Sequence, residues 1–355
     1  MLLPMNSNEE ITCNEGVRVR SAKDCLLCGE KGLILHKDVR DKLFRGPGVW
    51  SILRCPKCGL AWLNPRPLPE EIEKIYSSYY THNLTDQKMK LATLRKKLLQ
   101  AVLATSYGYD NISGSLNSSF KFIGKILGLL PPFKGRAGAS VMYVGGFKKG
   151  KLLDIGCGSG IFLDMMRNLG WDILGIEPDP EAARKAQECF HVPVLTTTLE
   201  EAHFPDKTFD ILTMRHVLEH VANPIRLLQE SERILKPGGR LFILTPNMES
   251  LGHRIFKKDW RGLEPPRHFY LFSQRALRRC TERVGLHIEK LQTSARGVHW
   301  IWHASRAVQS EGKYMGKHIR FRWKIEARAF QIIENLLLPF KKNMGEDLVF
   351  IGFKN

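Results

Sequence analysis

The second half of the chain alternates short apolar runs with longer amphipathic segments. The apolar runs have strand length and cover residues 151–155, 172–177, 193–195, 209–214, 240–245, 286–291 and 347–353. Helical periodicity connects them over residues 161–169, 180–190, 223–235 and 273–284. Strands that alternate with helices predict an α/β fold, a doubly wound and largely parallel sheet covered on both faces.

The first of these strands ends in a glycine-rich turn. Residues 152–160 read Leu-Leu-Asp-Ile-Gly-Cys-Gly-Ser-Gly, and an apolar helical segment follows. Glycines suit a turn whose backbone a ligand approaches closely. Ile161 stands where the dinucleotide-binding fingerprint needs Gly or Ala, and no Gly-Lys-Ser/Thr of a P-loop follows. The feature that distinguishes this turn from those two motifs is an acid, Asp154, two residues before Gly156.

This turn resembles the first motif of class I S-adenosylmethionine (SAM)-dependent methyltransferases, which reads apolar-apolar-Asp-apolar-Gly-x-Gly-x-Gly. The resemblance implies a Rossmann-like, seven-stranded sheet whose last strand, antiparallel, enters between the fifth and the sixth. It also implies SAM as the cofactor. Glu177 ends the second strand, where an acid can accept hydrogen bonds from ribose hydroxyls. The family pattern places Leu199 and Glu200 beside the adenine. The residues expected to bind SAM are Asp154, Gly156, Gly158, Gly160, Glu177, Pro178, Leu199, Glu200 and Arg215.

Two further stretches resemble the same methyltransferases and carry the predicted catalytic residues. Residues 215–221 match a His-Val-Leu-Glu-His motif that places His216 near the methionine part of SAM. The run Pro-Arg-His-aromatic around His268 makes that histidine the candidate for a base or for orienting the acceptor. Arg267 could pair with an anionic group, although both residues could instead brace the loop. Glu219 and His220 could hold a divalent ion, as in some relatives, or serve only for packing.

Paired cysteines mark the N-terminal part of the chain. Cys25 and Cys28 form one Cys-x-x-Cys-Gly unit, and Cys55 and Cys58 form a second after 26 intervening residues. Two such knuckles are typical of a zinc ribbon, in which four thiolates close a tetrahedral structural Zn²⁺ site. The proline-rich turn that follows resembles the metal-binding segment of bacterial small-molecule and sugar methyltransferases.

The domain organisation follows from these motifs. We expect a loose tail over residues 1–20, a zinc-ribbon-like module over 21–80, a helical connector over 81–150 and a methyltransferase domain over 151–355. Residues 292–346 form an insert on the acceptor side.

Within the connector, residues 89–104 and 120–130 predict basic amphipathic helices, and residues 135–150 predict a loop. The helices could touch an anionic membrane surface or only cap the catalytic domain, which is the interpretation we favour.

The charge balance bears on partners rather than on fold. The chain has 355 residues and a formal net charge of +18, which favours anionic partners or simply a basic solvated surface. No stretch has the form of a signal peptide or of a spanning helix, so a cytoplasmic location, with peripheral membrane contact as an option, is expected.

The predicted function is methyl transfer from SAM to a small-molecule acceptor: a sugar nucleotide, a lipid-linked or a quinone-like metabolite. An RNA methyltransferase is the first alternative, and nucleic acid is the less favoured partner because the Asn/Asp-Pro-Pro-Tyr motif and a paired cysteine nucleophile are missing. A non-catalytic SAM- or zinc-binding scaffold is the second alternative, and the intact glycine turn argues against it.

Overall fold

The computed structural model describes residues 11–76, 93–109, 112, 114, 116–146, 148–311, 320–338 and 340–355. The chain divides into two compact units, each built from several segments. Unit 1 comprises Met1–Tyr79, His216–Leu228 and Ile243–Phe350, and unit 2 comprises Tyr80–Arg215, Gln229–Phe242 and Ile351–Asn355. Among the described residues, no helix combines the length and the apolarity that crossing a membrane requires.

Parallel strands form the centre of unit 2. These strands are β7 (Lys151–Ile155), β8 (Asp172–Ile176), β9 (Val194–Leu195) and β10 (Phe209–Arg215). Strand β7 pairs in parallel with β8 and β10, and β8 pairs in parallel with β9. Four of the five residues of β7 are buried, as expected for a strand covered on both faces.

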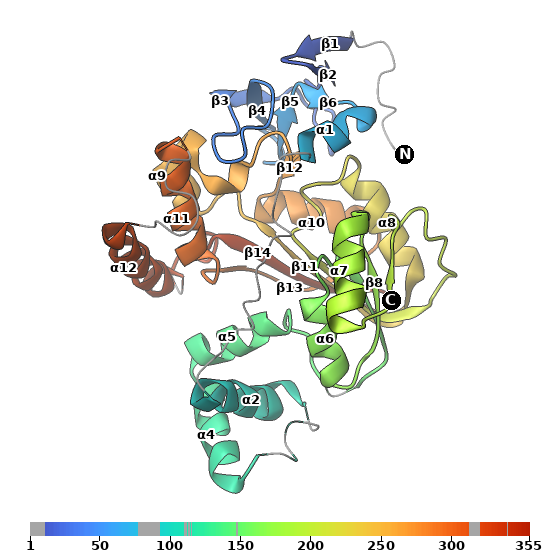
Figure 1. Cartoon of the computed structure of the whole chain (residues 1–355), viewed down its shortest axis with the longest axis vertical. Helices are drawn as coiled ribbons and strands as arrows, with labels where there is room; N and C mark the ends of the chain where they lie inside the picture. The colour runs from blue at the N-terminus through green and yellow to red at the C-terminus, as the bar shows by residue number, and fades with distance from the viewer. Residues whose placement is uncertain are drawn as a thin grey trace. The chain divides into compact units, whose positions relative to one another are not determined.

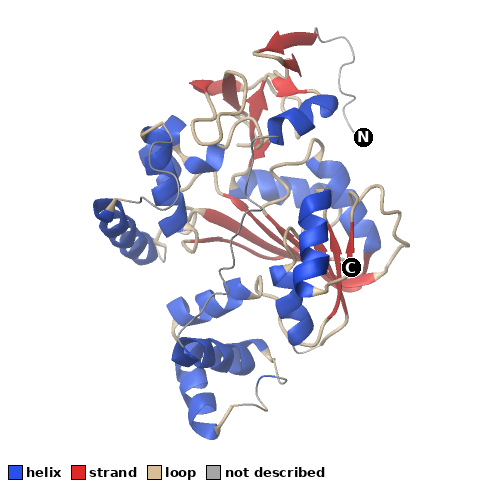
Figure 2. Cartoon of the chain, in the orientation of Figure 1, coloured by secondary structure: helices blue, strands red, loops and turns tan. Residues whose placement is uncertain are grey.

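One seven-stranded sheet contains all the strands predicted for the second half of the chain (Figure 2). The other three are β11 (Leu235–Pro246), β13 (His287–Ser294) and β14 (Asp347–Phe353). The strand order is β13-β14-β11-β10-β7-β8-β9, so the last strand lies between the fifth and sixth, as predicted. The connecting helices are α6 (Ile161–Asn168), α7 (Pro180–Phe190), α8 (Pro224–Ile234) and α10 (Gln274–Arg283). The predicted fold class is confirmed.

Three helices among the described residues of unit 2 precede the sheet, and Figure 1 shows them in teal and green. They are α2 (Thr93–Tyr107), α4 (Ser118–Leu129) and α5 (Pro131–Ser140). The expectation of a loop from residue 135 onward was wrong for residues 135–140. A proline in the first turn starts α5, and Gly138 lets it approach α2, since a Cβ there would meet the Tyr107 hydroxyl. Residues 89–92 of the first predicted helix lie outside the described residues.

Unit 1 holds two small antiparallel sheets. The first contains β1 (Ile11–Asn14), β2 (Val17–Arg20) and β6 (Arg66–Pro67) in that order. Residues 11–20 were expected to be part of a loose tail, but they form a hairpin because Val17 and Val19 are buried on one face. Residues 1–10 lie outside the described residues.

The second small sheet belongs to the cysteine-rich module. Its strands are β3 (Leu33–Val39), β4 (Trp50–Arg54), β5 (Ala61–Asn64) and β12 (Tyr270–Leu271), in the order β12-β5-β4-β3. Strand β12 comes from the stretch that contains His268, so this stretch is tied to the module by backbone hydrogen bonds.

Helices of 3 to 17 residues complete unit 1. They are η1 (Pro69–Glu71), α1 (Ile72–Tyr76), α9 (Leu251–Phe256), η2 (Lys257–Asp259), η3 (Arg261–Leu263), α11 (Val298–Gln309) and α12 (Phe321–Leu337). Helices α11 and α12 both lie within the insert expected over residues 292–346.

Candidate functional site

The glycine turn adopts backbone conformations that other residues avoid. Gly156, Gly158 and Gly160 have φ of +69°, +54° and +78°, the left-handed region that favours glycine. The backbone N–H groups of Gly156 and Cys157 donate to the carbonyl of Ile176, at 2.8 and 3.0 Å. These bonds hold the turn against the end of β8.

Two of these glycines have different surroundings. A Cβ added to Gly160 would lie 2.8 Å from Ala186 Cβ and 2.9 Å from Val192 Cγ2, so this glycine lets the turn pack on α7. A Cβ added to Gly158 would have none of the described heavy atoms within 4 Å. Gly158 therefore borders open space that a ligand could occupy.

Glu177 is fixed beside this open space. Its Oε2 accepts a hydrogen bond from the N–H of Gly158 at 2.8 Å, and its Oε1 accepts one from the N–H of Asp179 at 3.0 Å. Asp179 in turn caps α7 by accepting from the N–H groups of Glu181 and Ala182. The acid and the glycine turn are thus one hydrogen-bonded structure.

Asp154 lies buried at the carboxyl end of β7. Thr213 Oγ1 on the neighbouring strand donates to its Oδ1 at 2.6 Å. Burial raises the pKa of Asp154 to about 6, whereas the hydrogen bond from Thr213 and the charge of Arg215 lower it. Arg215 also lies over the ring of Phe162, 4.8 Å from its centroid. The role of Thr213 was not predicted, because a threonine inside an apolar strand looks like any β-branched residue.

All nine residues expected to bind SAM lie in unit 2. Pro178 joins Glu177 to the cap of α7, Leu199 is buried and Glu200 is half-buried in the turn after β9. The two predicted catalytic histidines, His216 and His268, lie in unit 1.

His216 directly follows β10. Its φ is +54°, and its side chain is 43% exposed. Its Nδ1 lies 3.3 Å from Oε1 of the fully buried Glu219. Burial opposes ionisation of Glu219, but the hydrogen bond from His216 and the nearby histidines lower the pKa of this carboxyl to about 2.

His268 is buried in the same unit. Its Nδ1 lies 2.7 Å from the carbonyl oxygen of Gly262, a distance at which Nδ1–H donates. Burial and the neighbouring His220 lower the pKa of His268 to about 4, so the ring is neutral at pH 7. The rings of His220 and His268 meet edge to face with centroids 4.6 Å apart.

Arg267 binds two buried acids. Its Nη2 donates to Asp41 Oδ2 at 2.7 Å, and its Nε donates to Glu264 Oε1 at 3.2 Å. Glu264 also pairs with Arg261. Arg267 is 1% exposed, so its position supports the bracing role more than the binding of a substrate anion. Asp41 could not have been found from sequence, because it lies 226 residues away and belongs to no motif.

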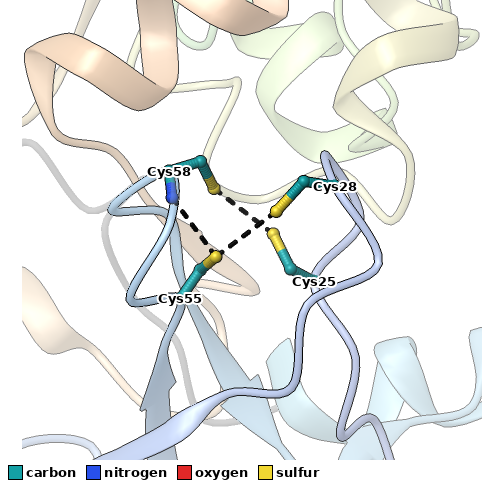
Figure 3. A group of neighbouring side chains, drawn as sticks. All are labelled: Cys25, Cys28, Cys55 and Cys58. Atoms are coloured by element: carbon teal, nitrogen blue, oxygen red, sulfur yellow. Dashed lines mark hydrogen bonds between the residues drawn. The ribbon is translucent and has the colours of Figure 1, made fainter.

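The four cysteines of the module converge in unit 1 (Figure 3). The Sγ atoms of Cys25 and Cys58 are 3.4 Å apart, as are those of Cys28 and Cys55. Tetrahedral zinc with Zn–S bonds of about 2.3 Å separates its sulfurs by about 3.8 Å.

The backbone of both knuckles fits such a site. Gly29 and Gly59 have φ of +69° and +78° and donate to the carbonyls of Cys25 and Cys55. Pairing with Cys25 lowers the pKa of Cys58, which favours a thiolate there. The four residues could therefore hold one zinc ion.

Comparisons with known proteins agree with the resemblance to methyltransferases over part of the chain. Residues 133–291 match the model of a family described as "Methyltransferase domain". A ubiquinone biosynthesis O-methyltransferase from Photobacterium profundum is 34% identical over 113 residues, which cover 30% of this chain and 47% of the relative. The mitochondrial enzyme of the same name from Mus musculus is 34% identical over 128 residues, covering 32% of this chain and 34% of the relative. The chain thus spans less than half the length of these curated relatives.

Solved structures that resemble this chain also include methyltransferases. A SAM-dependent methyltransferase from Thermotoga maritima, titled a possible histamine N-methyltransferase, is 24% identical with a TM-score of 0.40 and covers 59% of this chain and 83% of that one. Phosphoethanolamine N-methyltransferase 2 from Haemonchus contortus is 17% identical with a TM-score of 0.41, over 58% of this chain and 49% of that one. The family match confirms the predicted resemblance to methyltransferases over residues 133–291, the region that contains all nine expected SAM residues.

Proposed function

We propose that this chain is a SAM-dependent methyltransferase that acts on a small-molecule acceptor. The observation that carries the proposal is the pairing of the glycine turn with Glu177, beside open space at Gly158. This arrangement lies inside the region that matches a methyltransferase domain.

The residues of unit 2 fit the chemical groups of SAM. The carboxylate of Asp154 suits the ammonium group of the methionine part, and the oxygens of Glu177 suit the ribose hydroxyls. Leu199 and Glu200 are proposed to flank the adenine. SAM supplies an activated methyl group, so the protein has mainly to align the acceptor with it. Of the two predicted catalytic histidines, we retain His216, whose side chain is 43% exposed, as the candidate.

For the acceptor we propose a quinone-like phenol. The support is the similarity to relatives that are named ubiquinone biosynthesis O-methyltransferases. A phenolic hydroxyl must lose its proton during transfer, so this acceptor requires a base.

SAM titration by calorimetry tests the proposed cofactor. The wild type should bind one SAM, and Gly158→Arg should abolish binding because its side chain fills the open space. Gly238→Arg is the matched control, since Gly238 also has positive φ (+74°) and none of the described atoms within 4 Å of an added Cβ. No binding to the wild type, or equal loss in both variants, would refute the proposal.

Transfer of a labelled methyl group to cell fractions tests the acceptor. Label should appear in the small-molecule or lipid fraction and be extracted with phenolic compounds. Label in RNA would instead identify an RNA methyltransferase. Label in no fraction, despite SAM binding, would favour a non-catalytic role.

We further propose that α4 attaches the protein to an anionic membrane surface. On this helix the buried face carries small residues and the exposed face carries large apolar residues, whereas an ordinary surface helix buries its large apolar residues. Gly124 and Gly128 are buried, and a Cβ at either would collide with α2. The large apolar side chains instead point outward, with exposures of 65% for Phe122, 47% for Ile126 and 81% for Leu129.

The net charge of this segment of the chain favours a membrane as the occupant of the apolar face. Residues 93–150 contain nine Lys or Arg and a single acid, Asp110. Lys121 and Lys125 belong to α4 itself. Apolar side chains beside lysines are typical of helices that lie in the interface of anionic bilayers, and a lipophilic acceptor would be found there.

Vesicle sedimentation tests this attachment. Binding to phosphatidylglycerol vesicles should exceed binding to phosphatidylcholine vesicles, at about 1 kcal/mol for each lysine near the surface. Ile126→Glu with Leu129→Glu should weaken it at least about 100-fold, because each apolar side chain contributes about 1.5–3 kcal/mol. Ile11→Glu, at a residue 52% exposed in unit 1, is the control. Equal binding by all three proteins, or self-association through α4, would contradict the proposal.

A further inference from the structure

The stretch that contains His268 is part of the sheet of the cysteine-rich module. Strand β12 pairs antiparallel with β5, and Tyr270 lies opposite Trp62. One residue earlier, the carbonyl oxygen of Phe269 accepts a hydrogen bond from the N–H of Leu63 at 3.1 Å. Segments far apart in the sequence thus share one hydrogen-bonded ladder, and the position of this stretch depends on β5.

The same stretch holds the turn after β10. The carbonyl oxygen of Glu219 accepts hydrogen bonds from the N–H groups of Phe269 and Tyr270, at 2.8 and 3.2 Å. The carboxylate of Glu219 is itself fixed, because Oε2 accepts from Thr245 Oγ1 at 2.9 Å and Oε1 lies 3.3 Å from Nδ1 of His216. A continuous series of hydrogen bonds therefore leads from β5 through Phe269 and Glu219 to His216.

The second cysteine knuckle is the turn that joins β4 to β5. Arg54 and Ala61 pair directly across this hairpin, on either side of residues 55–60. Within the turn, the N–H of Cys55 donates to the carbonyl of Leu60 at 2.8 Å. The conformation of the knuckle therefore sets where β5 begins and which of its residues face β12.

Both knuckles also contact α10, the helix that follows β12. A Cβ added to Gly59 would lie 2.9 Å from Oγ of Ser273, and this oxygen caps α10 by accepting from the N–H of Ala276. From the other knuckle, the carbonyl oxygen of Leu27 accepts a hydrogen bond from Arg283 at 3.3 Å. The two knuckles thus contact the first and the last turn of α10.

The two knuckles would be joined by the metal ion that their cysteines fit. The four Sγ atoms converge from both knuckles (Figure 3). Thiol groups are weak hydrogen-bond donors, so contacts among them cannot replace coordination bonds. In small metal modules the free energy of metal binding is part of the free energy of folding. Loss of the ion should therefore loosen the hairpin of β4 and β5.

We propose that metal loading of the cysteine-rich module controls the order of residues 268–271 and, through Glu219, the position of His216. The consequence for catalysis rests on the proposed function, in which His216 is the candidate catalytic residue, whereas the coupling itself does not. A chain without metal would keep these side chains but lose their arrangement. Activity would then depend on the supply of metal although the ion takes no part in the chemistry.

Two contacts outside the knuckles limit the effect. Arg267 Nη2 donates to Asp41 Oδ2 at 2.7 Å, and the Nε2 atoms of His36 and His253 are 2.9 Å apart. These contacts attach β3 and the loop after it, and they involve no cysteine. Metal loss should therefore change the local order of β5 and β12 while the module as a whole stays attached.

Hydrogen exchange of the full chain, followed by mass spectrometry, tests the coupling. Removal of zinc with a chelator should speed exchange at least about tenfold in peptides that cover residues 216–221 and 268–272. Peptides of β7 in unit 2 should not change, and adding zinc back should restore the original rates. Unchanged exchange in both peptides, or faster exchange that includes β7, would overturn the proposal.

A substitution separates the two steps of the coupling. Glu219→Gln keeps the backbone carbonyl that binds Phe269 but removes the charge beside His216. It should shift the NMR signals of the His216 ring and leave exchange at residues 268–272 unchanged, whereas removal of zinc should alter both. Glu282→Gln, in an exposed ion pair, is the control and should alter neither. Ring signals of His216 that do not respond to zinc removal would refute the second step. Neither measurement uses SAM, so failure of SAM binding and failure of the coupling are separate results.

Discussion

Two glycines of the same turn should respond differently to the same substitution. Gly158 and Gly160 both have positive φ, so alanine at either site is strained by about 1–2 kcal/mol. Restricting the unfolded chain returns about 0.4–1 kcal/mol at each site. Only at Gly160 does the new methyl group also collide with Ala186 and Val192. Overpacking of this kind costs about 1–3 kcal/mol, so Gly160→Ala should be the less stable variant by that amount.

The two substitutions should affect SAM binding in the opposite order: Gly158→Ala should weaken it more than Gly160→Ala. The methyl group of Gly158→Ala enters the open space proposed for SAM, and we expect the Kd for SAM to rise at least about tenfold, which corresponds to about 1.4 kcal/mol. Gly160→Ala points its methyl group toward α7 and should retain affinity at temperatures where it is folded.

Thermal unfolding and calorimetry measure the two effects separately. The free energy difference between the variants corresponds to a difference in Tm of about 2–12 °C, with Gly160→Ala lower. Equal Tm values would refute the packing argument. Loss of SAM affinity in Gly160→Ala alone would refute the assignment of the space at Gly158.

Three other changes probe separate parts of the chain. Cys55→Ser should remove about one zinc per chain by metal analysis and destabilise unit 1, whereas Cys189→Ser, at an exposed free cysteine, should do neither. Arg267→Met should lower the free energy of unfolding by about 3–5 kcal/mol in denaturant titrations, because Asp41 would remain buried without its partner. Arg40→Met breaks an exposed pair and should leave the free energy of unfolding nearly unchanged. Since the pKa of Asp154 is about 6 and its carboxylate is the form that binds ammonium, SAM affinity should rise about tenfold between pH 5 and 7, and Asp154→Asn should abolish this rise; a flat wild-type profile would contradict it.

Much of unit 2 could be predicted because its elements depend on residues that are close together in the sequence. The strand at 151–155, the glycine turn and the helix after it each follow from neighbouring residues, and the structure has all three. The hairpin at 11–20 was missed because its burial depends on a third strand some fifty residues away. Helix α5 was missed because glycines usually break helices, whereas Gly138 is needed for contact with Tyr107.

The site in unit 1 was less accessible from sequence. His268 was recognised from its motif, but its burial and its neighbours were not. The hydrogen bond from its Nδ1 ends on a backbone carbonyl, which no side-chain pattern records. Its neighbour Arg267 pairs with Asp41, whose position depends on the fold of a different module.

The two hydrogen bonds on Glu177 have an entropic consequence. A free glutamate would have to give up its rotamers when a ligand arrives, but this carboxylate is already fixed by Gly158 and Asp179. That ordering is completed during folding, so binding does not have to supply it. Shortening Glu177 to aspartate would therefore loosen the turn as well as remove a contact to the ligand. We expect relatives that keep the glycine turn to keep this glutamate as well.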